Sequence, residues 1–120
     1  MSAGTLNLNI ERGSIFAKTL VWKDADKNPI SLAGKSARMQ IRQRVDDIAY
    51  IAELTTGNSG IVLESGSVTG QIQLYIGAVE TDTFDTDFAV YDLEIYENGN
   101  ANNVIRLLQG QVIISEGVTR

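Results

Sequence analysis

The chain has 120 residues, with 10 Lys plus Arg against 15 Asp plus Glu, and its formal net charge is -5. This is the usual length of one domain, and 43% hydrophobic residues are enough to close a single core over residues 1–120. The sequence has neither Cys nor His, which excludes thiol nucleophiles, imidazole proton relays and the metal sites that those side chains ligate. No cofactor is expected.

The N-terminal residues carry neither a basic nor a long apolar segment, and no later stretch approaches the roughly 18 consecutive apolar residues of a membrane helix. We therefore expect a protein made in the cytoplasm without an export signal or a membrane partner. Residues 1–60 hold eight basic and six acidic side chains (+2), and residues 61–120 hold two basic and nine acidic ones (-7), which together give -5. The acidic half argues against binding nucleic acid, because attraction to phosphate dominates such binding.

Alternation of apolar and polar residues predicts strands along the first half of the chain. One strand is expected around Leu6–Ile10 and a second around Phe16–Trp22, with a break near Arg12-Gly13. Asp24–Pro29 is rich in turn-forming residues, so the strand has to end before Pro29. After Gly34, a half-buried strand is expected with Ala37, Met39 and Ile41 inside, and Ile48–Leu54 is another extended candidate.

In the second half, turns are expected at Thr55–Gly60 and Glu64–Gly70 around a short strand, Ile61–Leu63. Strong alternation predicts a strand over Gln71–Ile76, and Ala78–Phe84 is a candidate for one helical turn between two sheets. A further strand should put Ala89, Tyr91, Leu93 and Ile95 on its buried face. Asn98–Asn103 is then expected to turn the chain into a last run, Val104–Ser115, in which Gly110 indicates a bulge or a break.

About seven to nine short strands in a chain of this length favour an all-β fold, an antiparallel immunoglobulin-like β-sandwich. Trp22, Tyr91 and Phe16 are expected in its core. The cysteines of antibody domains are absent, so the likeness is one of architecture.

Acidic side chains suggest two candidate cation sites, and both have a simpler interpretation. Asp24, Asp26 and Asn28 match the first ligands of a calcium loop, but Pro29 and Lys35 stand where that loop needs Gly and Glu. An ordinary hairpin turn is favoured there. The acidic cluster around Phe84 is favoured as a solvated loop; it contains Asp82, Asp85 and Asp87.

Catalysis is not expected from this sequence. A carboxylate pair could in principle hydrolyse glycosides, but nothing marks a cleft or a desolvated acid, and the glycines do not fit a phosphate-binding loop. A small hydrolase remains one alternative, and substitution of the carboxylate pair Asp92 and Glu94 would test it.

Six side chains are candidate partner contacts. Arg38, Arg42 and Arg44 lie on or just beyond one strand. They either grip an acidic partner or the acidic half of a neighbouring copy or, as we favour, pair across the sheet with Asp92 or Glu94. The other candidates are aromatic residues on the polar faces of their strands, where exposed rings often anchor contacts: Tyr75, Phe88 and Tyr96.

Five segments, spread over nearly the whole chain, carry a resemblance to a known group of proteins: Trp22–Gly34, Ala37–Arg42, Tyr91–Ile95, Arg106–Gly110 and Val118–Arg120. In these segments the chain resembles small tailed-bacteriophage virion proteins, in particular the N-terminal domain of the upper baseplate protein of lactococcal phages. That domain is a β-sandwich that docks a receptor-binding assembly onto the tail. The baseplate protein continues into a helical, receptor-proximal region, whereas this chain stops at Arg120.

The resemblance implies a virion structural protein without catalytic activity, located in the virion at the tail or baseplate or as a fibre adaptor. Its partners would be other virion proteins, and several copies would be arranged with symmetry. The alternatives are a capsid decoration or head-to-tail neck protein and, from another class, a carbohydrate-binding module with an aromatic platform such as Tyr75 with Tyr96. The matched positions are turns and core, so no functional residue is transferred.

Overall fold

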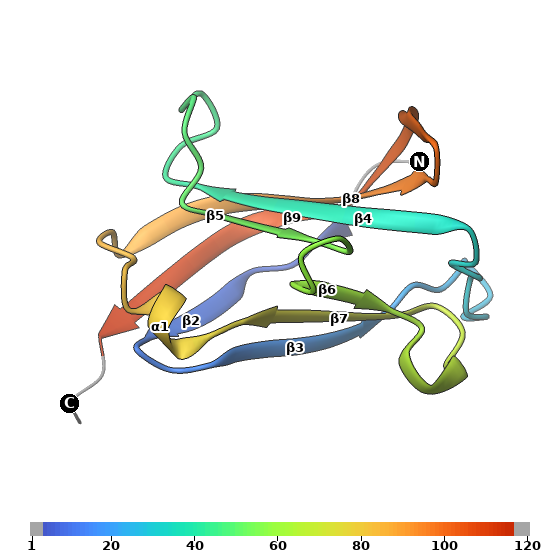
Figure 1. The fold of residues 1–120 in the computed structure, drawn as a ribbon, viewed down its shortest axis with the longest axis horizontal. Helices are drawn as coiled ribbons and strands as arrows, with labels where there is room; N and C mark the ends of the chain where they lie inside the picture. The colour runs from blue at the N-terminus through green and yellow to red at the C-terminus, as the bar shows by residue number, and fades with distance from the viewer. Residues whose placement is uncertain (1–3, 117–120) are drawn as a thin grey trace.

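The computed structural model describes residues 4–116, which fold into two β-sheets packed face to face (Figure 1). The described range contains nine strands, within the expected seven to nine. They are β1 (Gly4–Thr5), β2 (Leu8–Arg12), β3 (Phe16–Val21), β4 (Lys35–Arg42), β5 (Ala52–Thr55), β6 (Ile61–Leu63), β7 (Gln71–Ile76), β8 (Phe88–Glu97) and β9 (Asn100–Glu116). A short 3-10 turn, η1 (Ser65–Ser67), precedes β7, and one α-helical turn, α1 (Ala78–Thr81), follows it.

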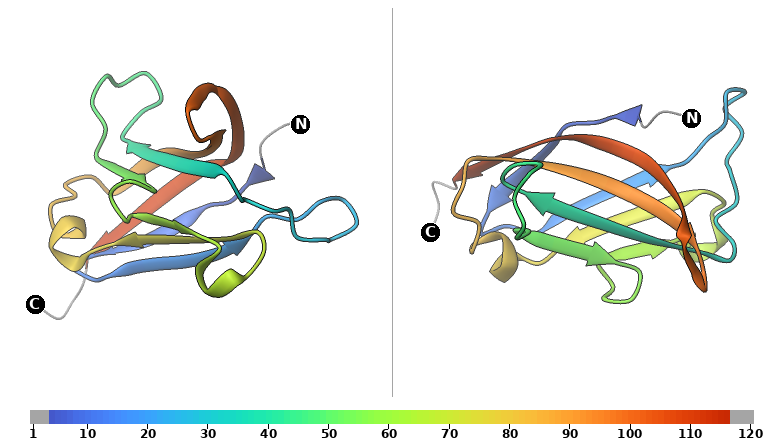
Figure 2. Two further views of the ribbon diagram at one scale, coloured as in Figure 1. Left: turned by 45° about the vertical axis from the view of Figure 1, so that its right-hand side comes forward. Right: turned by 90° about the horizontal axis from the view of Figure 1, so that it is seen from above.

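The order of the strands is that of an immunoglobulin-like sandwich (Figure 2). The large sheet runs β1-β9-β8-β4-β5, with β2 also paired to β9, and the small sheet runs β3-β7-β6. In immunoglobulin terms these are the strands G-F-C-C′ on one side and B-E-D on the other. The predicted fold class is therefore confirmed, and α1 makes the expected crossing from the small sheet to the large one.

The pairing of the first strands differs from the antiparallel arrangement that we expected. Both β1 and β2 run parallel to β9, with Leu8 beside Val112 and Ile10 beside Ile114. Because the chain enters along the β9 edge of the large sheet, the rest of the sandwich serves as the long crossover that a parallel pair requires.

Alternating residues of the central strands build one core between the sheets. In β4 the inward side chains are Ala37, Met39 and Ile41, all fully buried, as predicted. The buried face of β8 was also predicted correctly. The core consists of these buried hydrophobic residues: Leu8, Ile10, Phe16, Leu32, Ala37, Met39, Ile41, Ala52, Leu54, Ile61, Ile72, Leu74, Ile76, Phe84, Ala89, Tyr91, Leu93, Ile95, Val112 and Ile114. Trp22 packs against it only partly buried.

Two expected boundaries were wrong. The extended segment Ile48–Leu54 contains a strand only from Ala52, because residues 43–51 form a loop that projects from the end of β4 (Figure 1, upper left). The turn expected over Asn98–Asn103 is shorter, since β9 already begins at Asn100. Gly99, with φ of 78°, takes the left-handed conformation that this tight turn needs.

Gly110 does not mark a bulge or a break, because β9 is continuous through it. The register of β8 and β9 shifts elsewhere, between Leu93 and Glu94 and again between Tyr96 and Glu97. A Cβ on Gly110 would lie only 2.2 Å from the carbonyl oxygen of Leu6. The glycine therefore allows the segment between β1 and β2 to approach the β9 backbone closely.

Candidate functional site

The outer face of the large sheet carries the predicted arginine strand, and Arg38 is paired as we favoured. Arg38 Nε donates to Glu94 Oε1 at 2.8 Å, and its guanidinium lies 5.0 Å from the centre of the Tyr96 ring. The hydrogen bond to Glu94 raises the pKa of Arg38. The charge of Arg38 is thus paired with a carboxylate of the neighbouring strand, β8.

The other two arginines serve the loop of residues 43–51. Arg42 Nη1 donates to the carbonyl oxygens of Asp47 at 2.5 Å and Ile48 at 2.8 Å, and Arg42 Nη2 donates to Gln40 Oε1. Arg44 lies within the loop, where its backbone N–H donates to Asp47 Oδ2 at 3.2 Å. Arg38 and Arg42 therefore share the outer face of β4 but bind different partners, and Arg44 lies beyond the strand in the loop.

A groove of about 620 Å³ runs over the outer face of the large sheet. Its floor and walls come from four strands and from Val45 of the loop; the polar lining is Thr5, Gln40, Arg42, Asp92, Glu94, Arg106 and Gln109. Asp92 Oδ2 lies 3.5 Å from Arg106 Nε. Burial, followed by repulsion from Glu94, raises the pKa of Asp92, although the nearby arginines oppose the shift. These planar polar groups can exchange hydrogen bonds with a polar ligand.

Within residues 4–116, no group of three or more acidic side chains is placed to hold a metal ion. The calcium-like turn is an ordinary hairpin turn, as favoured. Asp24 Oδ1 accepts hydrogen bonds from the backbone N–H groups of Asp26 and Asn28, and a bridge between Lys23 and Pro29 closes the hairpin.

The three predicted aromatic anchors are separated by the fold. Phe88 and Tyr96 lie at opposite ends of the outer face of β8. Tyr75 lies on β7, and its outward-facing ring is on the other side of the sandwich. A platform of Tyr75 with Tyr96 is therefore excluded, because two packed sheets separate the rings.

Two features were not found from the sequence. The first is the exposure of the loop at residues 43–51, where Val45, Ile48 and Tyr50 all point into solvent. Ile48 was assigned to a strand, and only the density of charged residues at positions 44–47 could have indicated a loop.

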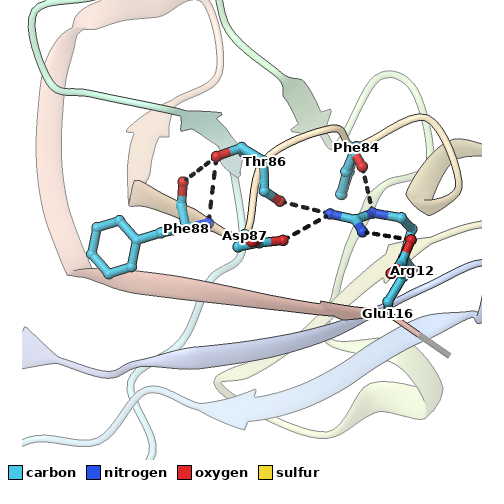
Figure 3. A network of polar contacts seen from close by, with 6 residues as sticks. All are labelled: Arg12, Phe84, Thr86, Asp87, Phe88 and Glu116. Carbon is cyan, nitrogen blue, oxygen red and sulfur yellow. Dashed lines mark hydrogen bonds and ion pairs between the residues drawn. The ribbon is translucent and has the colours of Figure 1, made fainter.

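The second is a network around Arg12 at the end of β2 (Figure 3). Arg12 Nε donates to Phe84 O at 2.5 Å, and Arg12 Nη2 donates to Thr86 O at 2.9 Å. Its guanidinium also lies 3.4 Å from Asp87 and 3.6 Å from Glu116. The two carbonyl contacts tie the α1–β8 connection to β2, and one member of the predicted acidic cluster, Asp87, adds an exposed ion pair to them.

A comparison with protein-family models gives no match, and neither does a comparison with curated proteins. Among solved structures, the chain is similar to the extracellular domain of the voltage-gated sodium channel beta4 subunit, described as a parallel homodimer with a role in cell-cell adhesion. The identity is 9%, the TM-score is 0.46, and the alignment covers 98% of each chain. At these values the likeness carries no argument about what this chain does or binds. Over the described residues, no helix has the length and apolar character to cross a membrane.

Proposed function

We propose that this chain is a structural component of a tailed-bacteriophage virion, acting at the tail or baseplate, or as a fibre adaptor, through protein-protein contacts and without catalysis. The observation that carries the proposal is the resemblance of its sequence segments, in order, to the baseplate domain. Trp22–Gly34 contains the hairpin after β3, Ala37–Arg42 lies in β4, and Tyr91–Ile95 lies in β8. Arg106–Gly110 lies in β9, and Val118–Arg120 falls outside the described residues.

The arrangement of the surface supports a role in packing. On the outer face of the large sheet, Arg38 is bound to Glu94 and Arg42 to loop carbonyls, so these groups are engaged within the chain rather than held ready for reaction. A continuous hydrophobic core supports that face, and apolar side chains remain exposed on a connecting loop. Rigid modules with exposed apolar contacts suit repeated assembly.

The experiment is to purify the phage particles that carry this gene, identify the chain by mass spectrometry and locate it by cryo-electron reconstruction. We expect density for the sandwich at the tail tip or fibre base. Density on the head or neck would favour the capsid decoration or neck alternative and contradict the tail location. Absence of the chain from purified particles would contradict the structural role itself.

A carbohydrate-binding role is the second candidate, and the groove over the large sheet favours it. Asp92, Arg106 and Gln109 offer planar polar groups of the kind that hydrogen-bond to sugar hydroxyls. If this role holds, host polysaccharide binds the purified chain and Asp92→Asn weakens binding, whereas Thr19→Ser on the small sheet does not. Absence of binding by the native chain would contradict this candidate.

A further inference from the structure

The loop between β4 and β5, residues 43–51, exposes apolar side chains that the core does not use. Ile48 is 97% exposed and Val45 is 84% exposed, and Tyr50 is half exposed. Isolated surface apolar residues are normal, but several on one short loop form a contact candidate. We call this segment the apolar loop.

The apolar loop is held in place by hydrogen bonds from within the chain. Arg42 donates to the carbonyl oxygens of Asp47 and Ile48, and the Asp47 carboxylate accepts from the backbone N–H of Arg44. The backbone N–H of Ile51 donates to the Ile41 carbonyl at 2.6 Å where the loop ends. Because these contacts already order the loop, a partner that binds it loses less conformational entropy on association.

An apolar groove of about 370 Å³ lies where the β1 edge of the large sheet meets β3. We call it the seam groove; it is lined by Gly4, Leu20, Val21, Trp22, Lys23, Ile72, Leu107 and Leu108. Its lining is mainly aliphatic and aromatic, and Lys23 is its one charged member. A groove of this character fits an apolar side chain accompanied by a negative charge.

The charges of the two surfaces are complementary. The apolar loop holds Arg44, Asp46 and Asp47, a net charge of -1, and Asp46 is exposed two residues before Ile48. On the groove side, the neighbour of Lys23 is Asp24, whose carboxylate is engaged by the backbone of its own turn. Lys23 lines the groove and Asp24 does not, so Lys23 is the charged side chain that an incoming loop would contact.

The positions of the two surfaces determine which molecule can bring them together. The apolar loop leads into β5, at one edge of the large sheet, and the seam groove lies beside β1, at the opposite edge. One chain cannot join its own loop to its own groove. Two different surfaces that match between copies give a heterologous, head-to-tail contact, which builds rings or open filaments.

We propose that the apolar loop of one copy of this chain packs into the seam groove of the next copy, with Ile48 in the groove and Asp46 beside Lys23. The inference deepens the proposed structural role and rests on it for its biological setting. It supplies the contact by which copies repeat in an assembly.

The test uses the purified full chain in analytical ultracentrifugation over a wide range of concentrations. The native chain should show a mass that rises above the 13.1 kDa monomer as concentration increases. Ile48→Ser should weaken association by about tenfold or more, as expected for a central contact residue. Val79→Ser is the matched control and should change nothing, because Val79 is 85% exposed on α1 and belongs neither to the apolar loop nor to the lining of the seam groove.

A mixture distinguishes the proposed pairing from other modes of association. Ile48→Ser keeps an intact groove, and Val21→Glu keeps an intact loop, so the two variants together should form a one-to-one dimer and no larger species. Asp46→Lys and Lys23→Asp should each weaken association, and combining both in one chain should restore it.

A native chain that stays monomeric at millimolar concentration, or a mixture that does not pair, would overturn the inference. So would a loss of association by Val79→Ser equal to that by Ile48→Ser. This outcome is separate from the fate of the proposed function, which is decided by whether the chain is present in particles.

Discussion

The hydroxyl of Tyr91 donates a hydrogen bond of 2.6 Å to the backbone carbonyl of Leu6, joining β8 to the segment between β1 and β2. The backbone N–H of Leu6 donates in turn to the Gln109 carbonyl at 3.0 Å. The close approach of Leu6 to Gly110 completes this arrangement. The segment that connects β1 to β2 is thus held in place by contacts with both β8 and β9.

Tyr91→Phe should lower the free energy of unfolding by about 1 kcal/mol at neutral pH, because it removes one hydrogen bond and leaves the Leu6 carbonyl without its phenolic partner. Urea unfolding of the two proteins measures the difference. Tyr75→Phe, on the exposed face of β7, is the control and should be close to neutral. Equal effects of the two substitutions would contradict the role of the Tyr91 hydroxyl.

At alkaline pH, the difference in the free energy of unfolding between the native chain and Tyr91→Phe should become smaller. Burial raises the pKa of Tyr91 from 10.0 to about 12. Since the folded state holds this proton more tightly than the unfolded state, the stabilisation is complete below pH 10 and is lost as pH rises from 10 towards 12. Urea midpoints measured at pH 9 and pH 11 should show the native chain losing more stability than the variant. A stability difference that is the same at pH 9 and pH 11 would contradict a raised pKa of Tyr91 in the folded state.

Gly110→Ala should destabilise the fold by about 2 kcal/mol or more, because its Cβ would overlap the Leu6 carbonyl oxygen. Gly77→Ala is the matched control. Gly77 has φ of -70° and open space around a Cβ, so the substitution should be neutral or slightly stabilising. Thermal and urea unfolding compare the two. If Gly110→Ala behaves like Gly77→Ala, the close approach at Leu6 is not a constraint on the fold.

Arg12→Ala should lower the free energy of unfolding by about 2–3 kcal/mol, because the backbone carbonyls of Phe84 and Thr86 lose a charged hydrogen-bond donor. Arg12→Lys should recover only part of this loss, since an ammonium group does not reproduce the fork of a guanidinium. Arg44→Ala, in the exposed loop, is the control and should stay within about 0.5 kcal/mol of the native value. Amide hydrogen exchange around residues 84–87 should increase in Arg12→Ala alone, and unchanged exchange there would contradict the tethering role.

Glu64→Gln should destabilise the fold at neutral pH, and the effect should shrink in acid. Glu64 Oε2 accepts hydrogen bonds from the backbone N–H groups of Gly70 at 2.8 Å and Leu32 at 3.0 Å, which lower the pKa of Glu64. A lowered pKa means stabilisation that is present above the ordinary value of 4.5 and lost as pH falls below it. Urea midpoints at pH 7 and pH 3 test this expectation, with Glu80→Gln as control. A difference independent of pH would show that the charge of Glu64 is not involved.

Most of the sandwich could be predicted from the sequence, because a strand with one buried face alternates apolar and polar residues with a period of two. Ala37, Met39 and Ile41 in β4 are the clearest case, and the short β6 was found because turn-forming residues flank it. The parallel pairing of β2 with β9 was missed, since alternation shows which face of a strand is buried and says nothing about which strand lies beside it.

The surface was less accessible to prediction. The pairing of Arg38 with Glu94 followed from cross-strand charges, but the register that brings them together is a property of the folded sheet. Tyr75 and Tyr96 were grouped because both face away from the core, yet the sequence does not tell which sheet each strand joins. Arg12 gave no local signal at all, because its hydrogen-bond partners are backbone carbonyls more than 70 residues away.

The parallel pair of β2 and β9 also determines how the domain responds to tension. β2 and β9 run in the same direction (Figure 1), so a pull on the N-terminal end of β2 against the C-terminal end of β9 slides the two strands past each other in opposite directions. The register pairs from Leu8–Val112 to Arg12–Glu116 are then loaded together in shear instead of being unzipped one at a time. A module connected in this way resists extension along the direction of these two strands.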